Sequence, residues 1–287
     1  MTGDRPARIL VTNDDGVHAP GIRRLARAAY EQGHDVVVAA PQSEASGMSA
    51  ALTAVTDDGR VVYTATELAG LAEVPAYGVA ASPAYIALLA TLGVFGPPPD
   101  LVLSGINRGT NAGHAVLHSG TVGAALTAAQ HGARALAVSL DVLSPAVASA
   151  GSGGAAIAVL DSVDDESRHW STAAELAGQL LPWLLDAAPA TVLNLNVPDL
   201  PAEQVAGLRR ATLAPFGQVQ VTVAESGEGF ARTVIEASHA RPVPGSDLAW
   251  LADGYAAVTA LRPLGDLPDV AIPTARSAAD AEERALG

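Results

Sequence analysis

Residues 8–21 read Arg8-Ile-Leu-Val-Thr-Asn-Asp-Asp-Gly-Val-His-Ala-Pro-Gly21, and this stretch decides the fold. Its apolar run, Ile9 to Val11, predicts a buried parallel strand that ends at residues 13–15, where Gly16 turns the chain out of the sheet. In open α/β sheets the ligand site lies outside the carboxyl ends of the strands. Two adjacent carboxylates at such a strand end repel each other. A bound hard divalent cation would remove the energetic cost of this repulsion. The alternative is a solvated turn, the commoner role of Asp-Asp-Gly.

The composition limits the classes of protein to which this chain can belong. Its 287 residues, 49% of them hydrophobic, suffice for one large domain or a domain with a smaller appendage. The net charge of −14 argues against a nucleic-acid polymer or an anionic membrane as partner. Without cysteine or lysine, thiolate and Schiff-base chemistry are excluded. No apolar signal segment or membrane-length stretch is evident, so we expect a cytoplasmic protein.

The order of the expected elements predicts a doubly wound α/β fold with a mostly parallel, Rossmann-like sheet. A helical pattern at residues 19–32 follows the first strand, and a Val-rich strand at 35–40 comes next. Further strands are expected at 60–66, 74–79, 100–103, 134–140, 191–196 and 254–261, and further helices at 82–92, 119–130 and 171–186. No GxGxxG follows the first strand, so the dinucleotide-binding fingerprint is absent.

The pattern divides the chain into two regions. We expect residues 1–207 to form the Rossmann-like catalytic core, with 141–169 as an inserted loop rich in glycine and acidic residues. Residues 208–287 are expected to form a C-terminal β-hairpin extension, an oligomerisation region that also contributes a last core strand. The hairpin is too long and apolar to stand alone, so we expect it to pack on a second subunit.

Two further segments follow strand ends at the edge of the sheet that carries the two carboxylates, and a third lies beside them. One is serine-rich, residues 43–49, and one combines glycine with asparagine, residues 104–111. The third, Ser119-Gly-Thr121, opens an Ala-rich helix whose free backbone N–H groups suit a phosphate. The first and third also have ordinary explanations, as a surface loop and a helix N-cap.

Together these motifs resemble the SurE family of divalent-metal-dependent nucleotidases. The family's opening pattern, NDDG-hydrophobic-x-A-P-G, matches residues 13–21. Further matches are AP-x4-SG-x-S-x-x-(I/L)-T at 40–53, PD-x-V-x-SGIN-x-G-x-N-x-G at 99–113, SGTV at 119–122, LNVNVPD at 193–199 and GTD-x-x-A-x-x-x-GY at 245–255. The resemblance covers most of the chain, and its most specific motifs lie before residue 125.

The resemblance implies a phosphomonoesterase that hydrolyses nucleoside monophosphates through a metal-activated water, as a homodimer or homotetramer. One divalent ion, Mg²⁺ or Mn²⁺, would be held by Asp14, Asp15, Ser46 and Asn107, with Asp14 and Asp15 also catalytic. The phosphate and the rest of the small phosphorylated substrate would contact Asn13, Asn111, His118, Ser119, Gly120 and Thr121. An Asp-x-Asp phosphatase with an aspartyl nucleophile fits poorly, because Gly16 stands two residues beyond Asp14.

The chain also departs from the family pattern around these motifs. A Gly-Thr-Pro-Ala-Asp segment reads Gly78-Val-Ala-Ala-Ser82, and Asp-Val-x-Tyr reads Ala115-Val-Leu-His118. We infer retained chemistry with an altered leaving-group pocket, where His118 stacks on a base, protonates a leaving oxygen, or only packs locally. Two other functions stay open: a phosphatase of a phosphorylated biosynthetic intermediate, and a non-catalytic nucleotide or metabolite binder.

Overall fold

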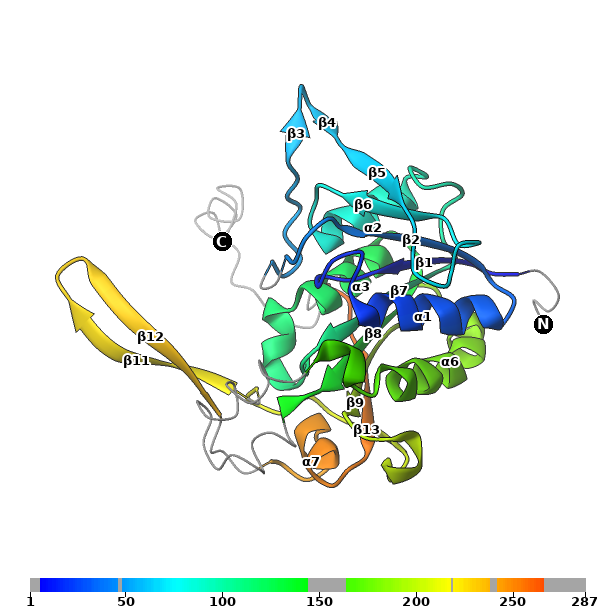
Figure 1. The fold of residues 1–287 in the computed structure, drawn as a ribbon. Coiled ribbons are helices and arrows are strands. Elements are labelled where there is room, and N and C mark those ends of the chain that lie inside the picture. Colours follow the sequence, from blue (N-terminus) through cyan, green and yellow to red (C-terminus); the bar gives the residue numbers. More distant parts are fainter. Residues whose placement is uncertain (1–5, 46–47, 144–163, 218, 238–241, 266–287) are drawn as a thin grey trace, which may run out of the picture.

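A computed structural model describes residues 6–45, 48–143, 164–217, 219–237 and 242–265 (Figure 1). Its centre is a nine-stranded sheet in the order β10-β13-β9-β8-β7-β1-β2-β6-β5. The strands are β1 (Arg8–Thr12), β2 (Asp35–Pro41), β5 (Tyr63–Thr66), β6 (Ala76–Val79), β7 (Leu101–Arg108), β8 (Arg134–Asp141), β9 (Val192–Pro198), β10 (Leu208–Arg210) and β13 (Ala256–Leu261). All neighbours from β9 to β6 are parallel, while β5 and β13 join them antiparallel. The predicted fold class is therefore confirmed.

Helices cover both faces of this sheet (Figure 1). They are α1 (Pro20–Glu31) and α6 (Trp170–Asp186) on one face, and α2 (Pro83–Thr91) and α3 (Gly120–Gln130) on the other. Alternate residues of β1 point to opposite sides, so Ile9 packs with α1 and Leu10 with α2 and α3. Because both faces are buried, the central strands read as continuous apolar runs.

Several elements differ in extent from the expectation. The strand expected at 100–103 continues to Arg108, because β7 resumes its pairing with β8 after a register shift between Ser104 and Asn107. The segment expected as one strand at 60–66 forms β4 (Arg60–Val61), which pairs with β3 (Thr56–Asp57), and then β5. The 3₁₀ helix η1 (Gly113–His118) and the helix α7 (Asp247–Ala252) are short elements that the pattern does not predict.

The C-terminal region contributes both to the main sheet and to a separate hairpin. Strands β10 and β13 extend the sheet beyond β9. Strands β11 (Val219–Gly227) and β12 (Phe230–Ala237) pair antiparallel and project from the body of the molecule (Figure 1). Of the expected insertion at 141–169, residues 144–163 lie outside the described part of the chain. Among the described helices, none is both long and apolar enough to cross a bilayer.

Candidate active site

The first two predicted metal ligands lie where β1 ends, between its two parallel neighbours. Strands β2 and β7 pair with β1 on either side, so their carboxyl ends meet at one edge of the sheet. The Asp14 side chain is buried and that of Asp15 is half-buried. The backbone N–H of Ala45, after β2, donates to the Asp14 carbonyl at 2.7 Å. The loops after β1 and β2 thus touch at this edge.

Asp14 and Asn107 converge on one hydroxyl of helix α3. The Thr121 Oγ1 lies 2.5 Å from Asp14 Oδ1 and 3.2 Å from Asn107 Oδ1. The Asn107 amide nitrogen donates to the Gly109 carbonyl at 2.8 Å, which turns its Oδ1 toward the carboxylates. The register shift just before Asn107 allows this, because a bulge re-aims the side chains that follow it.

Gly120 lets the start of α3 approach Asp14 closely. A Cβ at this position would stand 2.8 Å from Asp14 Oδ2 and 3.1 Å from its Cβ. Both distances are shorter than carbon contacts in close-packed proteins, so any larger residue would displace the carboxylate. The middle residue of the Ser119-Gly-Thr121 sequence therefore has to be glycine for α3 to lie this close to Asp14.

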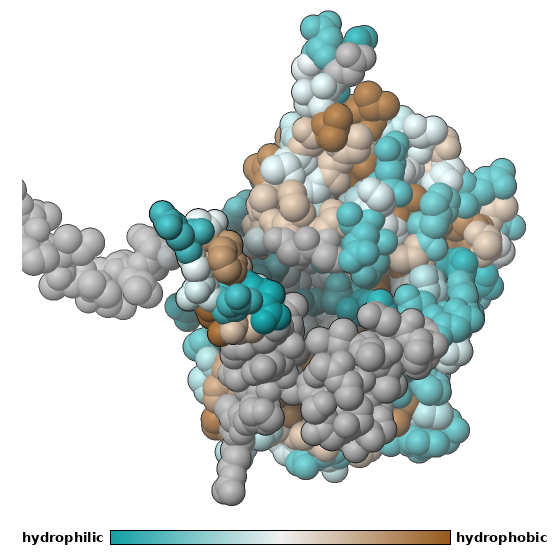
Figure 2. Space-filling view, turned by 60° about the vertical axis from the view of Figure 1, so that its left-hand side comes forward, coloured by the Kyte–Doolittle hydropathy of each residue, from teal (hydrophilic) through white to brown (hydrophobic). Residues whose placement is uncertain are grey.

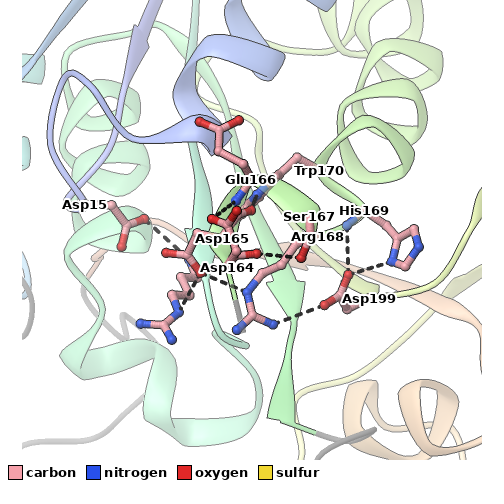
Figure 3. Close-up of polar contacts among 10 residues, drawn as sticks. Asp15, Asp164, Asp165, Glu166, Ser167, Arg168, His169, Trp170 and Asp199 are labelled. Atoms are coloured by element: carbon pink, nitrogen blue, oxygen red, sulfur yellow. Dashed lines mark hydrogen bonds and ion pairs between the residues drawn. The ribbon is translucent and has the colours of Figure 1, made fainter. Parts of the chain in front are cut away.

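Asp15 is held from the other side, by the end of β7. Its Oδ2 accepts a hydrogen bond from the backbone N–H of Arg108 at 3.3 Å. The Arg108 guanidinium pairs with Asp165 at 3.1 Å, and Asp165 also pairs with Arg168 at 2.9 Å. Arg168 continues the chain of ion pairs to Asp199 (Figure 3). The described end of the expected insertion, residues 164–169, is thereby tied to the candidate site.

The electrostatics of the two carboxyl groups follow from their burial. Burial raises the pKa of Asp14, and the hydroxyl and backbone N–H of Thr121 partly offset that rise. Burial and then the neighbouring charge on Asp14 raise the pKa of Asp15 to about 7. The charges of Glu44 and Asp165 act in the same direction on Asp15. Two crowded acids that resist ionisation are the environment that a bound divalent cation relieves.

The donor set fits a hard divalent cation. Asp14, Asp15 and Asn107 supply carboxylate and amide oxygens, the ligands that Mg²⁺ and Mn²⁺ prefer. Nowhere in the described residues do three or more His, Cys, Asp or Glu side chains gather as a metal cluster. Ser46, the fourth predicted ligand, lies outside the described residues.

The predicted phosphate-contacting residues take different positions. Ser119 caps α3, its Oγ accepting the N–H of Val122 at 3.0 Å. Asn13 is fully buried and closes its own turn, its amide bonding both the N–H and the carbonyl of Gly16. His118 ends η1 with an exposed side chain. Gly120 and Thr121 lie directly beside Asp14.

Asn111 is fixed by polar side chains that the sequence reasoning did not single out. Its amide nitrogen donates to Ser139 Oγ at 2.8 Å, and its backbone N–H to Asn196 Oδ1 at 2.9 Å. Its carbonyl accepts from the amides of Asn194 and Asn196. The matched motif at 193–199 contained both asparagines, but only the pairing of β8 with β9 brings them under this loop.

A second buried anchor of this loop comes from the C-terminal region. The Asp247 carboxylate accepts the backbone N–H groups of Gly113 and Ala214, at 2.7 and 2.9 Å. It is fully buried, and these hydrogen bonds compensate its charge. The matched motif at 245–255 was the only sequence signal for this residue.

At the carboxyl edge of this parallel sheet, two acids and an asparagine oxygen lie next to a helix N-terminus. This arrangement is typical of α/β proteins that bind phosphate groups. Comparison with known families agrees: residues 9–219 match the family described as Survival protein SurE. The chain belongs to the SurE family.

Named relatives share most of this chain. It is 35% identical over 260 residues to the 5'/3'-nucleotidase SurE of Shigella dysenteriae serotype 1, covering 89% of this chain and 90% of the relative. It is 33% identical to the 5'-nucleotidase SurE of Aeromonas hydrophila, covering 88% and 91%. The crystal structure of the SurE protein from Aquifex aeolicus superposes with a TM-score of 0.66 at 27% identity, covering 91% and 95%. The named relatives are phosphomonoester hydrolases, so the chain falls in an enzyme family.

Proposed function

We propose that this protein is a divalent-metal-dependent phosphomonoesterase that hydrolyses nucleoside monophosphates. One observation carries the proposal: the oxygens of Asp14, Asp15 and Asn107 gather at one strand edge, against the N-terminus of α3. The names of the relatives, 5'- and 5'/3'-nucleotidases, support the choice of substrate. The resemblance to a metal-dependent family supports the need for a divalent ion, Mg²⁺ or Mn²⁺.

The carboxylates of Asp14 and Asp15, the Asn107 amide oxygen and Ser46 would hold the ion. When bound, a divalent cation supplies Lewis acidity, which polarises a phosphoryl group and lowers the pKa of a bound water. The Thr121 hydroxyl keeps the Asp14 carboxylate turned to this point, and the Arg108 N–H does the same for Asp15. The Gly109 carbonyl holds the Asn107 amide with its oxygen facing the acids.

The phosphate itself would rest on neutral donors. The N-terminus of α3 carries partial positive charge, and its first residues lie beside Asp14. The Ser119 hydroxyl accepts from Val122 and still has its own proton to donate toward a phosphate oxygen. An arrangement of neutral donors suits a protein without lysine, in which the cation supplies the positive charge.

A panel of substrates tests the proposal. Phosphate release would be measured from nucleoside monophosphates, sugar phosphates and other small phosphomonoesters, with Mg²⁺, Mn²⁺ or a chelator. We expect metal-dependent release with nucleoside monophosphates ranked first. A higher rank for another phosphomonoester would favour a biosynthetic phosphatase. Metal-bound protein that releases no phosphate from any substrate would contradict the proposal and favour a binding protein.

A further inference from the structure

A shallow pocket of about 360 Å³ lies along the loop that follows β2, which contacts the loop that carries the two carboxylates. Its wall is built from the loop that follows β2, residues 41–45, 48 and 53–55, and from residues 79–82, which join β6 to α2. This volume lies within the range of pockets that hold small organic ligands. Nothing in the catalytic geometry described above uses it.

The pocket adjoins the catalytic edge directly. The Ala45 N–H donates to the Asp14 carbonyl at 2.7 Å, and the Val17 N–H donates to the Pro41 carbonyl at 2.9 Å. A group attached to a phosphate held at the carboxylates therefore has this pocket as its neighbour.

Most of the described residues that line the pocket are apolar, and none of them is a cation. The polar members are Gln42, Ser43, Glu44, Thr53 and Ser82. Its apolar members include Ala45, Met48, Val55, Val79, Ala80 and Ala81. The Ser82 hydroxyl is hydrogen-bonded within the pocket wall: it donates to the Ala51 carbonyl at 2.5 Å and accepts the Thr53 N–H at 3.2 Å. Neither Arg nor His is among the described lining residues, and Glu44 adds negative charge. Such a lining favours an uncharged group with an apolar face and disfavours an anion.

We infer that this pocket receives the leaving group of the substrate and selects phosphomonoesters whose leaving group is uncharged and largely apolar. The inference rests on the proposed function, because it needs a phosphate bound at Asp14 and Asp15. Esters whose leaving group carries a second phosphate are rejected, since no cation among the described residues of the pocket wall pairs with that phosphate.

Two valines beside this pocket offer a matched pair of variants. The Val55 N–H donates to the Ala80 carbonyl at 2.8 Å, and the Ala80 N–H donates to the Val62 carbonyl at 3.0 Å. Val55 lines the pocket and Val62 does not, yet both side chains are exposed, at 75% and 48%. Figure 2 shows apolar surface just below the β3–β4 hairpin, the part of the chain where both residues lie. Either residue is therefore replaceable without disturbing the core.

The experiment compares three phosphomonoesters in the full-length protein with Mn²⁺: 1-naphthyl phosphate, AMP and adenosine 3',5'-bisphosphate. We expect kcat/KM for the first two to exceed that for the bisphosphate by about tenfold or more. Val55→Asp should raise KM for 1-naphthyl phosphate about fivefold or more and leave kcat nearly unchanged. Val62→Asp should leave both constants unchanged.

The outcomes separate this inference from the proposed function. Equal turnover of the bisphosphate and 1-naphthyl phosphate, or equal effects of Val55→Asp and Val62→Asp, would overturn the leaving-group pocket while phosphatase activity stands. No metal-dependent release from any of the three esters would instead count against the proposed function, and with it the inference. Circular dichroism and the thermal midpoint of both variants check that each is folded.

Discussion

Asp14 and Asp15 are neighbours in sequence, but the fold treats their carboxylates differently. Asp14 turns inward to the N-terminus of α3 and the Thr121 hydroxyl, and Asp15 turns to the end of β7 and the Arg108 N–H. Each carboxylate is therefore oriented by a different element. The cost of keeping two buried acids together falls on the metal-free protein, where it is measurable.

Metal-free protein should lose stability as the pH rises. Folding raises the pKa of Asp15 from 3.8 to about 7, so between these values the folded state holds a proton that the unfolded chain has released. The free energy of unfolding therefore falls from about pH 4 to about pH 7 and levels off above. Urea denaturation with a chelator checks this, and Asp15→Asn should reduce the fall. Identical pH profiles of both proteins would contradict the account.

Gly120→Ala should impair catalysis without unfolding the protein. The added Cβ would stand 2.8 Å from Asp14 Oδ2, so the carboxylate must move, and we expect kcat to fall about tenfold or more. Gly178→Ala in α6 is the matched control, because its Cβ would meet only the far end of the Gln32 side chain, which donates to the Gly178 carbonyl at 3.1 Å. That variant should keep full activity and unfold at an equal or higher temperature. Equal activity of both variants would show that Gly120 has no such role.

The residues of the site differ in how far the sequence could predict them. Asp14, Asp15 and Asn107 could be predicted from the sequence, because each follows a recognisable strand within a long motif. The structure brings them together. The ion-pair chain from Arg108 through Asp165 and Arg168 to Asp199 could not be predicted, because it joins three segments that are far apart in sequence and that only tertiary packing brings together. The buried turn of Asn13 is likewise invisible in composition.

At the scale of elements, α3 combines two duties at its first turn. Ser119 closes the helix end as its N-cap, while the residues after it face the carboxylates. The sequence offered capping and phosphate binding as alternatives for this motif. The observed cap leaves the hydroxyl proton of Ser119 available, so the two duties are compatible.

Two substitutions of Ser119 separate these duties. Ser119→Ala removes the cap and should lower the free energy of unfolding by about 1 kcal/mol. Ser119→Asp retains a cap, so stability should stay near that of the wild type. Its negative charge should nevertheless raise KM for AMP about tenfold, because it repels the phosphate. Denaturation curves and steady-state kinetics measure both effects, and an Asp variant with an unchanged KM would exclude phosphate contact at Ser119.

Long elements were predicted better than short ones. The amphipathic helix at 20–31 and the Val-rich β2 carry clear periodicities, and both were expected within a residue or two of their ends. The 3₁₀ helix at 113–118 and α7 are both too short to show an apolar period, and both donate backbone N–H groups to the buried carboxylate of Asp247. A local pattern carries no trace of such a tertiary anchor.

At the scale of the whole molecule, the β11–β12 hairpin extends away from the sheet (Figure 1). Val223 and Phe230 on it are 64% and 55% exposed, which is costly for apolar side chains of this size. We expect the protein to be a homodimer or homotetramer in solution, with this hairpin in the interface. Replacing residues 219–237 by a short Gly-Ser linker should yield monomers in small-angle scattering. A monomeric wild type would refute the expectation.

The most direct test of the account is AMP hydrolysis by Asp14→Asn, measured with Mn²⁺ and with chelator. Asp35→Asn is the matched control, because Asp35 only pairs with Arg8 at the far end of the strands. We expect the wild type and Asp35→Asn to release phosphate only with metal, and Asp14→Asn to lose at least about a thousandfold in kcat/KM while remaining folded. Metal-dependent hydrolysis by Asp14→Asn at the wild-type rate would contradict the assignment of the site.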